Sequence, residues 1–369
     1  MHSFNSCNDR SRTYAPGHCP AYSNASLPDD RWHCRAAHAA LRSDSEIGPS
    51  LFDQVKAFFQ NAGFRATVPV LTLISGFLLF RTGLDQQWHK LATKKARTIL
   101  VPFLVFNLGL LAAAYALQRA TGITTSYELI PFDARTWLDA AFGLTRSPIN
   151  YPLNFLRDLI VLMLLAPLFG LFLRKAPWLG LAVVALVFLN NVDGLLVLRG
   201  LMPVMFYIGG MAAVRRWNLQ ALDGYAWLCL AAFVLSCLAM LHWRVTNVTY
   251  LGLVAPFLIW PAASLLNGSA VGRWLQQQSK YSFFIFIAHA PILLVTWMVF
   301  QKLSGHVPYV VYWVGAPLLV VALLTVVYRI AAYLMPSAFA FITGGRAARG
   351  GESDQRRATP ELAGGHSPH

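Results

Sequence analysis

Apolar residues along this chain of 369 residues gather into long segments separated by short polar connectors. The first two segments, 66–80 and 98–117, flank a connector dense in lysine and arginine. Seven more follow, at 155–173, 178–192, 200–214, 225–242, 249–266, 282–300 and 309–334. Because a helix needs about 20 apolar residues to span a bilayer, the pattern predicts an all-α fold, a polytopic transmembrane helical bundle of about nine membrane helices.

The two ends of the chain lack this pattern. Residues 1–50 are polar, have no apolar period and contain no apolar signal-peptide core, so we expect a disordered or aberrant tail there. In 51–65, Leu51, Val55 and Phe58 recur at helical spacing among polar residues, which predicts an amphipathic helix in the membrane interface. We expect the transmembrane domain at 66–335 and a disordered cytoplasmic tail at 336–369.

The positions of the lysine and arginine residues predict how the bundle is oriented in the membrane. Short connectors rich in lysine and arginine stay in the cytoplasm, so the connector at 81–97, with Asp85 as its one acid, is placed there. Every second connector after it is also basic, with Arg174 and Lys175, Arg215 and Arg216, Arg273 and Lys280, and then the C-terminal tail. We therefore expect a bacterial cytoplasmic-membrane protein whose C-terminus is cytoplasmic.

This orientation raises a question about the start of the chain. If segment 66–80 runs inward, the polar residues before it lie outside, with nothing to carry them across. We expect that a preceding transmembrane helix belongs here and hypothesise that the first 40 or so residues are an aberrant start. Sequencing the locus tests this, because an apolar helix should be encoded in some frame upstream of Leu51.

Composition excludes several classes of protein. With 56% hydrophobic residues and a mean hydropathy of +0.49, the chain is too apolar for an ordinary soluble enzyme. The net charge of +14 comes from bases at the ends of apolar segments, so we expect no nucleic-acid partner. Cys7, Cys19 and Cys34 show no CxxC spacing, and we expect no metal.

Five pieces of sequence resemble the acyltransferase 3 family of membrane-bound O-acyltransferases, which modify bacterial surface glycans. In family order they are VPVLTLISGFLLFR at 68–81, KKARTILVPFLVFN at 94–107, NFLRDLIVLMLLAPL at 154–168, FYIGG at 206–210 and YSFFIFIAHAPILL at 281–294. The resemblance covers about 65–340. It implies ten core helices, of which the first would be absent here.

In the family, that first helix carries an arginine followed eleven positions later by a histidine thought to act in acyl transfer. No arginine here has a histidine at that offset. His38 lies about as far ahead of Ser75 and Gly76 as the family histidine would, and the resemblance makes it a candidate catalytic residue. His289, inside an apolar run, is a second candidate, since a polar group in a membrane helix needs a partner or a role. A satisfied core histidine is the alternative.

The resemblance implies acetyl-CoA as the acyl donor. Lys94, Lys95 and Arg97 on the cytoplasmic connector suit its phosphates and match the family's Arg-x-x-Arg motif, with Lys94 in the first place. Their alternative role is to set topology. Near the outer end of the third segment, Arg157 and Asp158 are candidates for contacting the acceptor or acyl group, with a structural ion pair as the alternative. Asn107 is a further candidate for substrate binding.

We therefore expect an enzyme that moves an acyl group, acetyl above all, to a hydroxyl of a cell-envelope or exported polysaccharide. Its partners would be membrane lipid and the saccharide acceptor. A transporter or flippase of a lipid-linked saccharide is the alternative of another class, although no internal repeat supports it. The nonfunctional product of a damaged gene is a third hypothesis.

Overall fold

The computed structural model describes residues 50–192, 196–243, 245, 249–303 and 305–345, and these residues form helices and connecting turns without a strand. Seven helices or continuous helical runs in this part are long and apolar enough to cross a membrane: Leu51–Arg81, Trp88–Thr121, Tyr151–Lys175, Asp223–His242, Thr249–Leu266, Ala270–Leu303 and Tyr309–Leu334. Two shorter apolar helices are Pro177–Asn190 and Leu201–Val214. Each of the nine expected segments coincides with a helix, so the prediction of an all-α polytopic bundle is confirmed.

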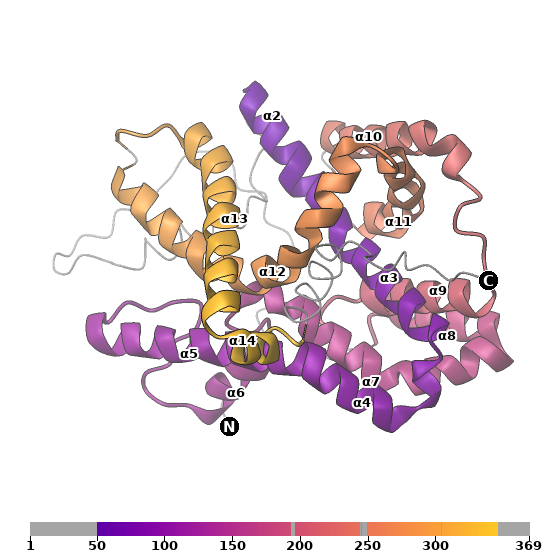
Figure 1. Cartoon of the computed structure of the whole chain (residues 1–369), viewed down its shortest axis with the longest axis horizontal. Helices are drawn as coiled ribbons and strands as arrows, with labels where there is room; N and C mark the ends of the chain where they lie inside the picture. Colours follow the sequence, from indigo (N-terminus) through magenta and orange to yellow (C-terminus); the bar gives the residue numbers. More distant parts are fainter. Residues whose placement is uncertain (1–49, 193–195, 244, 246–248, 304, 346–369) are drawn as a thin grey trace, which may run out of the picture.

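The individual helices are labelled in Figure 1. The first half contains α2 (Leu51–Ala57), α3 (Thr67–Arg81), α4 (Trp88–Lys95), α5 (Val101–Thr121), α6 (Ala134–Phe142), α7 (Asn154–Lys175) and α8 (Pro177–Asn190). The second half contains α9 (Leu201–Val214), α10 (Ala226–His242), α11 (Thr249–Ala263), α12 (Ala270–Leu303), α13 (Tyr309–Leu334) and α14 (Pro336–Ile342). Short turns of other pitch lie at Phe58–Ala62, Gly63–Ala66, Leu84–Gln86, Ala96–Leu100, Tyr151–Leu153, Asp223–Tyr225 and Ser264–Leu266.

The structure changes the expected boundary at residue 65. The helix expected at 51–65 is present, but it continues into α3 through a π turn and a 3-10 turn. Ala62 and Ala66 are fully buried in a cluster with Cys237 of α10 and Leu251 of α11, and this packing holds the two parts of the helix together. The place of residues 51–65 at the membrane interface stays a prediction.

The tail expected to be disordered from residue 336 instead begins with α14. Phe339 is buried against Phe284 of α12 and Tyr328 of α13, with ring centroids 5.3 and 5.0 Å apart. This tertiary packing orders a segment of 7 residues, which is too short to show a helical period of its own. In Figure 1, α14 lies at the foot of α13, beside α5.

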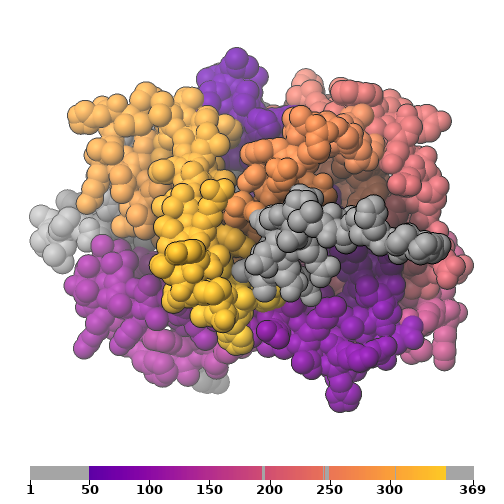
Figure 2. Space-filling model, viewed as in Figure 1, coloured from indigo at the N-terminus to yellow at the C-terminus, as the bar shows by residue number. Residues whose placement is uncertain are grey.

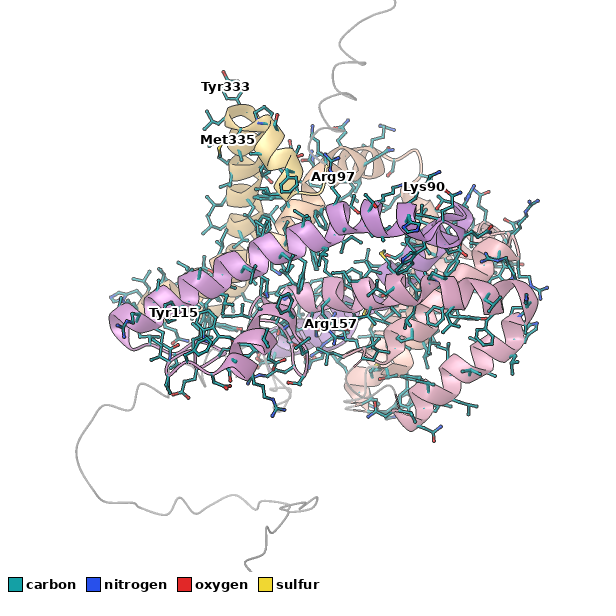
Figure 3. The ribbon with its side chains drawn as sticks, turned by 90° about the horizontal axis from the view of Figure 1, so that it is seen from below. Lys90, Arg97, Tyr115, Arg157, Tyr333 and Met335 are labelled. Atoms are coloured by element: carbon teal, nitrogen blue, oxygen red, sulfur yellow. The ribbon has the colours of Figure 1, made fainter. Side chains whose placement is uncertain are left out.

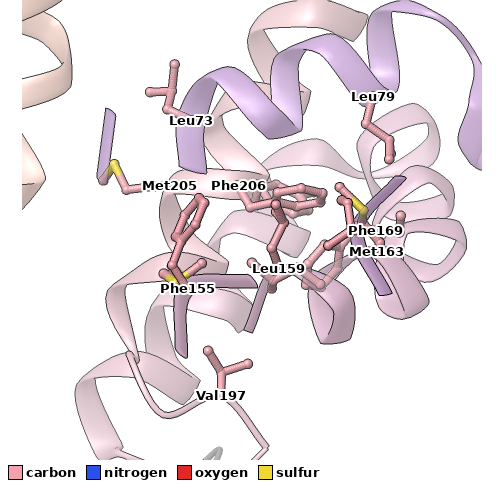
Figure 4. Close-up of a cluster of buried hydrophobic side chains, with 14 of the residues drawn as sticks. Leu73, Leu79, Phe155, Leu159, Met163, Phe169, Val197, Met205 and Phe206 are labelled. Carbon is pink, nitrogen blue, oxygen red and sulfur yellow. The ribbon is translucent and has the colours of Figure 1, made fainter. Parts of the chain in front are cut away.

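The largest core cluster forms where α3 crosses α9, with α7 against them. Figure 4 shows its buried side chains, among them Leu73, Phe155, Met163, Phe169 and Phe206. Gly76 of α3 lies against the backbone of Phe206, and Gly209 of α9 lies against the backbone of Leu73, so closely that neither position has room for a Cβ atom. Gly76 and Gly209 therefore allow the two helices to approach closely.

A folded cap, residues 122–150, joins α5 to α7. It contains α6 and has its own buried cluster, in which Tyr127, Leu129, Ala140 and Ile149 pack against Leu111 of α5. The Asp133 carboxylate accepts from the backbone N–H of Thr136 and so caps the start of α6. This connector is therefore a compact unit rather than an open loop.

Candidate functional site

A basic pocket of about 880 Å³ lies where α4 and the turn after it meet the end of α14. Its lining residues, which define the basic pocket below, are Leu84, His89, Lys90, Thr93, Lys94, Arg97, Thr98, Ala340, Gly344 and Gly345. Two of the three expected donor-binding residues, Lys94 and Arg97, therefore line one pocket. The third, Lys95, is half-buried and lies outside the lining.

The helical spacing explains how the bases meet. Lys90, Lys94 and Arg97 are separated by four and three positions, which places them along one face of a helix. A π turn at Ala96–Leu100 carries Arg97 between α4 and α5, and such turns are frequent at functional sites. In Figure 3, Lys90 and Arg97 lie along the same stretch of this helical run. No acidic side chain in the described part of the chain pairs with these three bases.

An ion pair fastens the connector that leads into the basic pocket. Asp85 lies in the turn before α4, and its buried Oδ2 accepts from Nη2 of Arg174, at the end of α7, at 2.7 Å. Gly170, one turn earlier in α7, makes room for this pair, since a Cβ there would meet both side chains. The pair was not predicted from sequence, because its partners are far apart in the chain.

A second polar group lies at the other end of α7. Asp158 is completely buried, and its Oδ1 accepts from Nη1 of Arg157 at 2.9 Å and from the backbone N–H of Leu198 at 3.1 Å. Its Oδ2 accepts from the backbone N–H of Arg199 at 3.1 Å, and Arg157 also donates to the carbonyl of Leu196 at 2.6 Å. The expected pair is thus present, and it holds the segment that leads into α9.

Asn107 connects α5 to the cap. It is fully buried, its Nδ2 donates to the carbonyls of Ala140 and Ala141 at 2.9 and 2.5 Å, and its Oδ1 accepts from the backbone N–H of Asn150 at 3.0 Å. Both polar atoms of its side chain are therefore engaged within the protein. This arrangement favours a structural role for Asn107 over the substrate contact expected from sequence.

Asn150 extends this network towards α12. Its Nδ2 donates to the carbonyl of Ile287 at 3.2 Å, two residues before His289, while its Oδ1 is buried without a partner in the described structure. Asn154, at the start of α7, likewise has a buried Oδ1 without a partner. Sequence reasoning missed Asn150, because only the fold brings it to α12.

His289 lies half-buried in α12. Its Nδ1 lies 3.1 and 2.8 Å from the carbonyl oxygens of Ile285 and Phe286, one helical turn earlier. Two carbonyl acceptors require the proton to be on Nδ1, so the neutral ring has its lone pair on Nε2. Nε2 has the chemistry of a general base. The other candidate base, His38, lies outside the described residues.

Hydrogen bonds in the cap set the ionisation of Asp139. Burial raises the pKa of the Asp139 carboxyl. The carboxylate, however, accepts hydrogen bonds from the backbone N–H and hydroxyl of Thr145 and from the backbone N–H and Nε of Arg146. These bonds outweigh burial and lower the pKa below the ordinary 3.8. Arg146 also lies 4.0 Å above the ring of Tyr127. Burial, together with the charge of Asp139, raises the pKa of Tyr127 to about 12. The contacts of Asp139 and Arg146 with Thr145 and Tyr127 therefore stabilise the folded cap.

Comparisons with known proteins give a consistent result. The sequence model of a family described as an acyltransferase domain matches residues 34–332, a range that includes His38. The chain is 31% identical over 316 residues to the succinoglycan biosynthesis protein ExoH of Rhizobium meliloti (strain 1021), and the alignment covers 80% of this chain and 83% of that protein. No solved structure gives a significant match.

Proposed function

This chain belongs to the acyltransferase 3 family, and from that premise we propose that it transfers an acetyl group from acetyl-CoA to a hydroxyl of a cell-envelope or exported polysaccharide. It is a multi-pass membrane protein, and we place it in the bacterial cytoplasmic membrane. The similarity to a succinoglycan biosynthesis protein supports a saccharide as the acceptor.

The observation that carries this proposal is the basic pocket. Coenzyme A is an anionic, cytoplasmic molecule, and the pocket presents Lys90, Lys94 and Arg97 on the connector that the charge pattern assigns to the cytoplasm. Arg97 can bind a phosphate with two parallel hydrogen bonds, whereas each lysine offers a point charge. A volume of about 880 Å³ falls in the range of small-molecule sites.

Helix α5 connects the basic pocket to the residues around the candidate base. Arg97 and Asn107 are ten positions apart in one helical run, roughly 15 Å at about 1.5 Å per residue. Asn107 is bonded to Asn150, which in turn is bonded to α12 two residues before His289. We propose that the acyl arm of a donor held by its phosphates at Arg97 extends along α5 towards His289.

The transfer itself needs a base and a leaving group. The acceptor hydroxyl oxygen attacks the thioester carbonyl carbon, and its proton passes to Nε2 of His289 or to His38. When the tetrahedral intermediate collapses, the C–S bond breaks, and the coenzyme A thiolate leaves and takes up a proton. We place the acceptor near Arg157 and Asp158, whose contacts shape the outer end of α7.

Glycan analysis of a deletion strain tests the function. Mass spectrometry should show the loss of an ester-linked acyl group from the polysaccharide while its export continues. Complementation with the intact gene serves as the control. Blocked export with normal acylation would instead support a flippase and contradict the proposed enzyme.

Lys94→Ala combined with Arg97→Ala tests the donor site. In membranes supplied with acetyl-CoA, the double variant should raise KM for acetyl-CoA by on the order of 100-fold or more, since it removes two charge-assisted hydrogen bonds that each contribute about 1.5–3 kcal/mol. Lys175→Ala is the matched control, because Lys175 is an exposed base on the same predicted side outside the pocket. An unchanged KM in the double variant would reduce Lys94 and Arg97 to topology signals.

A further inference from the structure

We propose that α14 and the Gly344–Gly345 turn form the uncharged wall of the donor site and determine which donors fit it. This inference rests on the proposed function, because it takes the basic pocket as the acetyl-CoA site. Ala340, Gly344 and Gly345 line the pocket together with Lys90, Lys94 and Arg97, although some 240 residues of chain separate the two groups. In Figure 2 the yellow C-terminal segment meets the purple part of the chain along the lower edge of this face.

The wall is firmly anchored behind the pocket. Phe339, next to Ala340, is buried among the rings of Phe284 and Tyr328. Thr343, next to Gly344, is also buried, and its hydroxyl donates to the carbonyl of Phe339 at 2.7 Å. Residues on either side of the lining positions are therefore fixed by packing, so that Ala340 and the glycines hold a defined place.

The turn contacts the basic side of the pocket directly. A Cβ atom on Gly344 would lie 2.7 Å from the carbonyl oxygen of Thr98 and 2.8 Å from its Cα, and Thr98 follows Arg97 in the π turn. Gly344 and Gly345 both have left-handed backbones, with φ of 73° and 76°. The left-handed backbone favours glycine at position 344, and the close approach to Thr98 requires it. This approach sets the distance between the two walls.

The two walls differ in chemistry. The backbone N–H of Gly344 donates to the carbonyl of Phe341 at 3.1 Å, and that of Gly345 donates to Ala340 at 2.6 Å. The turn therefore offers no free N–H to a phosphate, and its lining consists of a methyl group and glycine Cα atoms. Phosphates belong to the basic wall, whereas this wall gives the uncharged part of the nucleotide a surface for van der Waals contact.

Filling the pocket from this wall tests the proposal. Ala340→Leu adds volume inside the lining without changing charge or helix propensity, and Ala338→Leu is the matched control on an exposed position of the same helix outside the lining. Ala340→Leu should raise KM for acetyl-CoA at least 10-fold with kcat unchanged, and Ala338→Leu should leave both constants unchanged. Equal KM values for the two variants would overturn the inference.

A second pair of variants tests the close approach. Asparagine tolerates a left-handed backbone, so Gly344→Asn introduces mainly the clash with Thr98. Gly268→Asn is the control, since Gly268 has φ of 73° and open space around its Cβ position. Gly344→Asn should raise KM for acetyl-CoA, and Gly268→Asn should not; equal melting temperatures would show that both variants are folded. Equal KM values in folded variants would contradict the assigned role of the turn.

The outcome for Lys94→Ala with Arg97→Ala separates the two proposals. A raised KM in that double variant with no effect of Ala340→Leu refutes the wall alone. No effect of either change refutes the pocket as the donor site. A raised KM in Ala340→Leu alone supports the wall and contradicts the assigned phosphate contacts.

Discussion

Arg174 and Asp85 form an ion pair whose two members are unequally exposed. The Asp85 side chain is completely buried, whereas the Arg174 side chain keeps 37% of its surface accessible. Arg174→Met would leave an unpaired buried carboxylate, so we expect it to lower the free energy of unfolding by about 3–5 kcal/mol. Asp85→Asn should cost less, because the guanidinium that it leaves can reach water. Thermal unfolding in detergent micelles measures both.

The double variant that combines Arg174→Met with Asp85→Asn is the control for this pair. With the charge at position 85 removed, Arg174→Met should destabilise far less than it does in the wild type. Lys175→Met removes a neighbouring exposed base without a described partner and should have little effect. Equal losses from Arg174→Met with and without Asp85 would contradict the pairing.

Alanine at Gly76 or Gly209 should loosen the crossing of α3 and α9. A Cβ at either position meets backbone of the opposite helix, which has no rotamer to adjust, so each variant should cost about 1–3 kcal/mol or more. Gly109→Ala and Gly315→Ala, in helices where the Cβ meets open space, should instead stabilise by about 0.5–1 kcal/mol. Melting temperatures of the four variants would show these opposite signs.

Asn107→Leu should detach the cap from α5. It removes the donor to Ala140 and Ala141 and the acceptor for Asn150, and each buried group left unpaired costs about 1–3 kcal/mol. Hydrogen exchange in residues 122–150 should then accelerate. Asn190→Leu is the control, because the side chain of Asn190 is exposed and bonds only within its own helix. Reduced activity with unchanged exchange would restore Asn107 as a substrate contact.

His289→Asn separates catalysis from structure. The asparagine amide can replace the Nδ1 donor to the carbonyls of Ile285 and Phe286, but it cannot act as a base. If His289 is the base, kcat should fall by about 10²–10⁴-fold while KM for acetyl-CoA stays the same. Wild-type kcat in this variant would show a structural histidine and leave His38 as the candidate base.

The cap should lose stability in acid through Asp139. Hydrogen bonds lower its pKa below 3.8 despite burial, so the unfolded cap binds the proton more readily than the folded one. This stabilisation is fully present above the unfolded value and is lost as pH falls through the folded pKa. Hydrogen exchange of residues 122–150, corrected for intrinsic rates, should accelerate below about pH 4. Asp139→Asn should exchange faster at neutral pH and show a weaker pH dependence.

The nine apolar segments could be predicted because backbone groups in lipid must be satisfied within a helix, which leaves a direct record in hydropathy. The spacing of Lys90, Lys94 and Arg97 likewise predicts that they lie on one face of a helix. The opposite wall of that pocket, with Ala340 and Gly344, could not be predicted, because α14 owes its order to burial of Phe339 against two distant helices.

In the candidate site, the partners of Asn107 could not be predicted from the sequence either. Its position inside an apolar helix marked it as unusual, but its hydrogen-bond partners lie 33 to 43 residues further along the chain. Sequence spacing indicates which residues share a helix face, whereas the partners of a buried polar group depend on how the cap folds back. The Asp85–Arg174 pair was missed for the same reason.

Helix α7 is fixed at both ends, by Asp158 on the side of the cap and by Arg174 on the side of the connector. These residues are sixteen positions apart, roughly 24 Å along a helix. A lone apolar helix adapts to a thicker or thinner bilayer by tilting. The bonds at both ends of α7 prevent it from tilting relative to the rest of the protein. A thickness mismatch must therefore be met by tilting of the whole bundle or by deformation of the lipids, and we expect the activity to depend on the chain length of the lipids in which the protein is reconstituted.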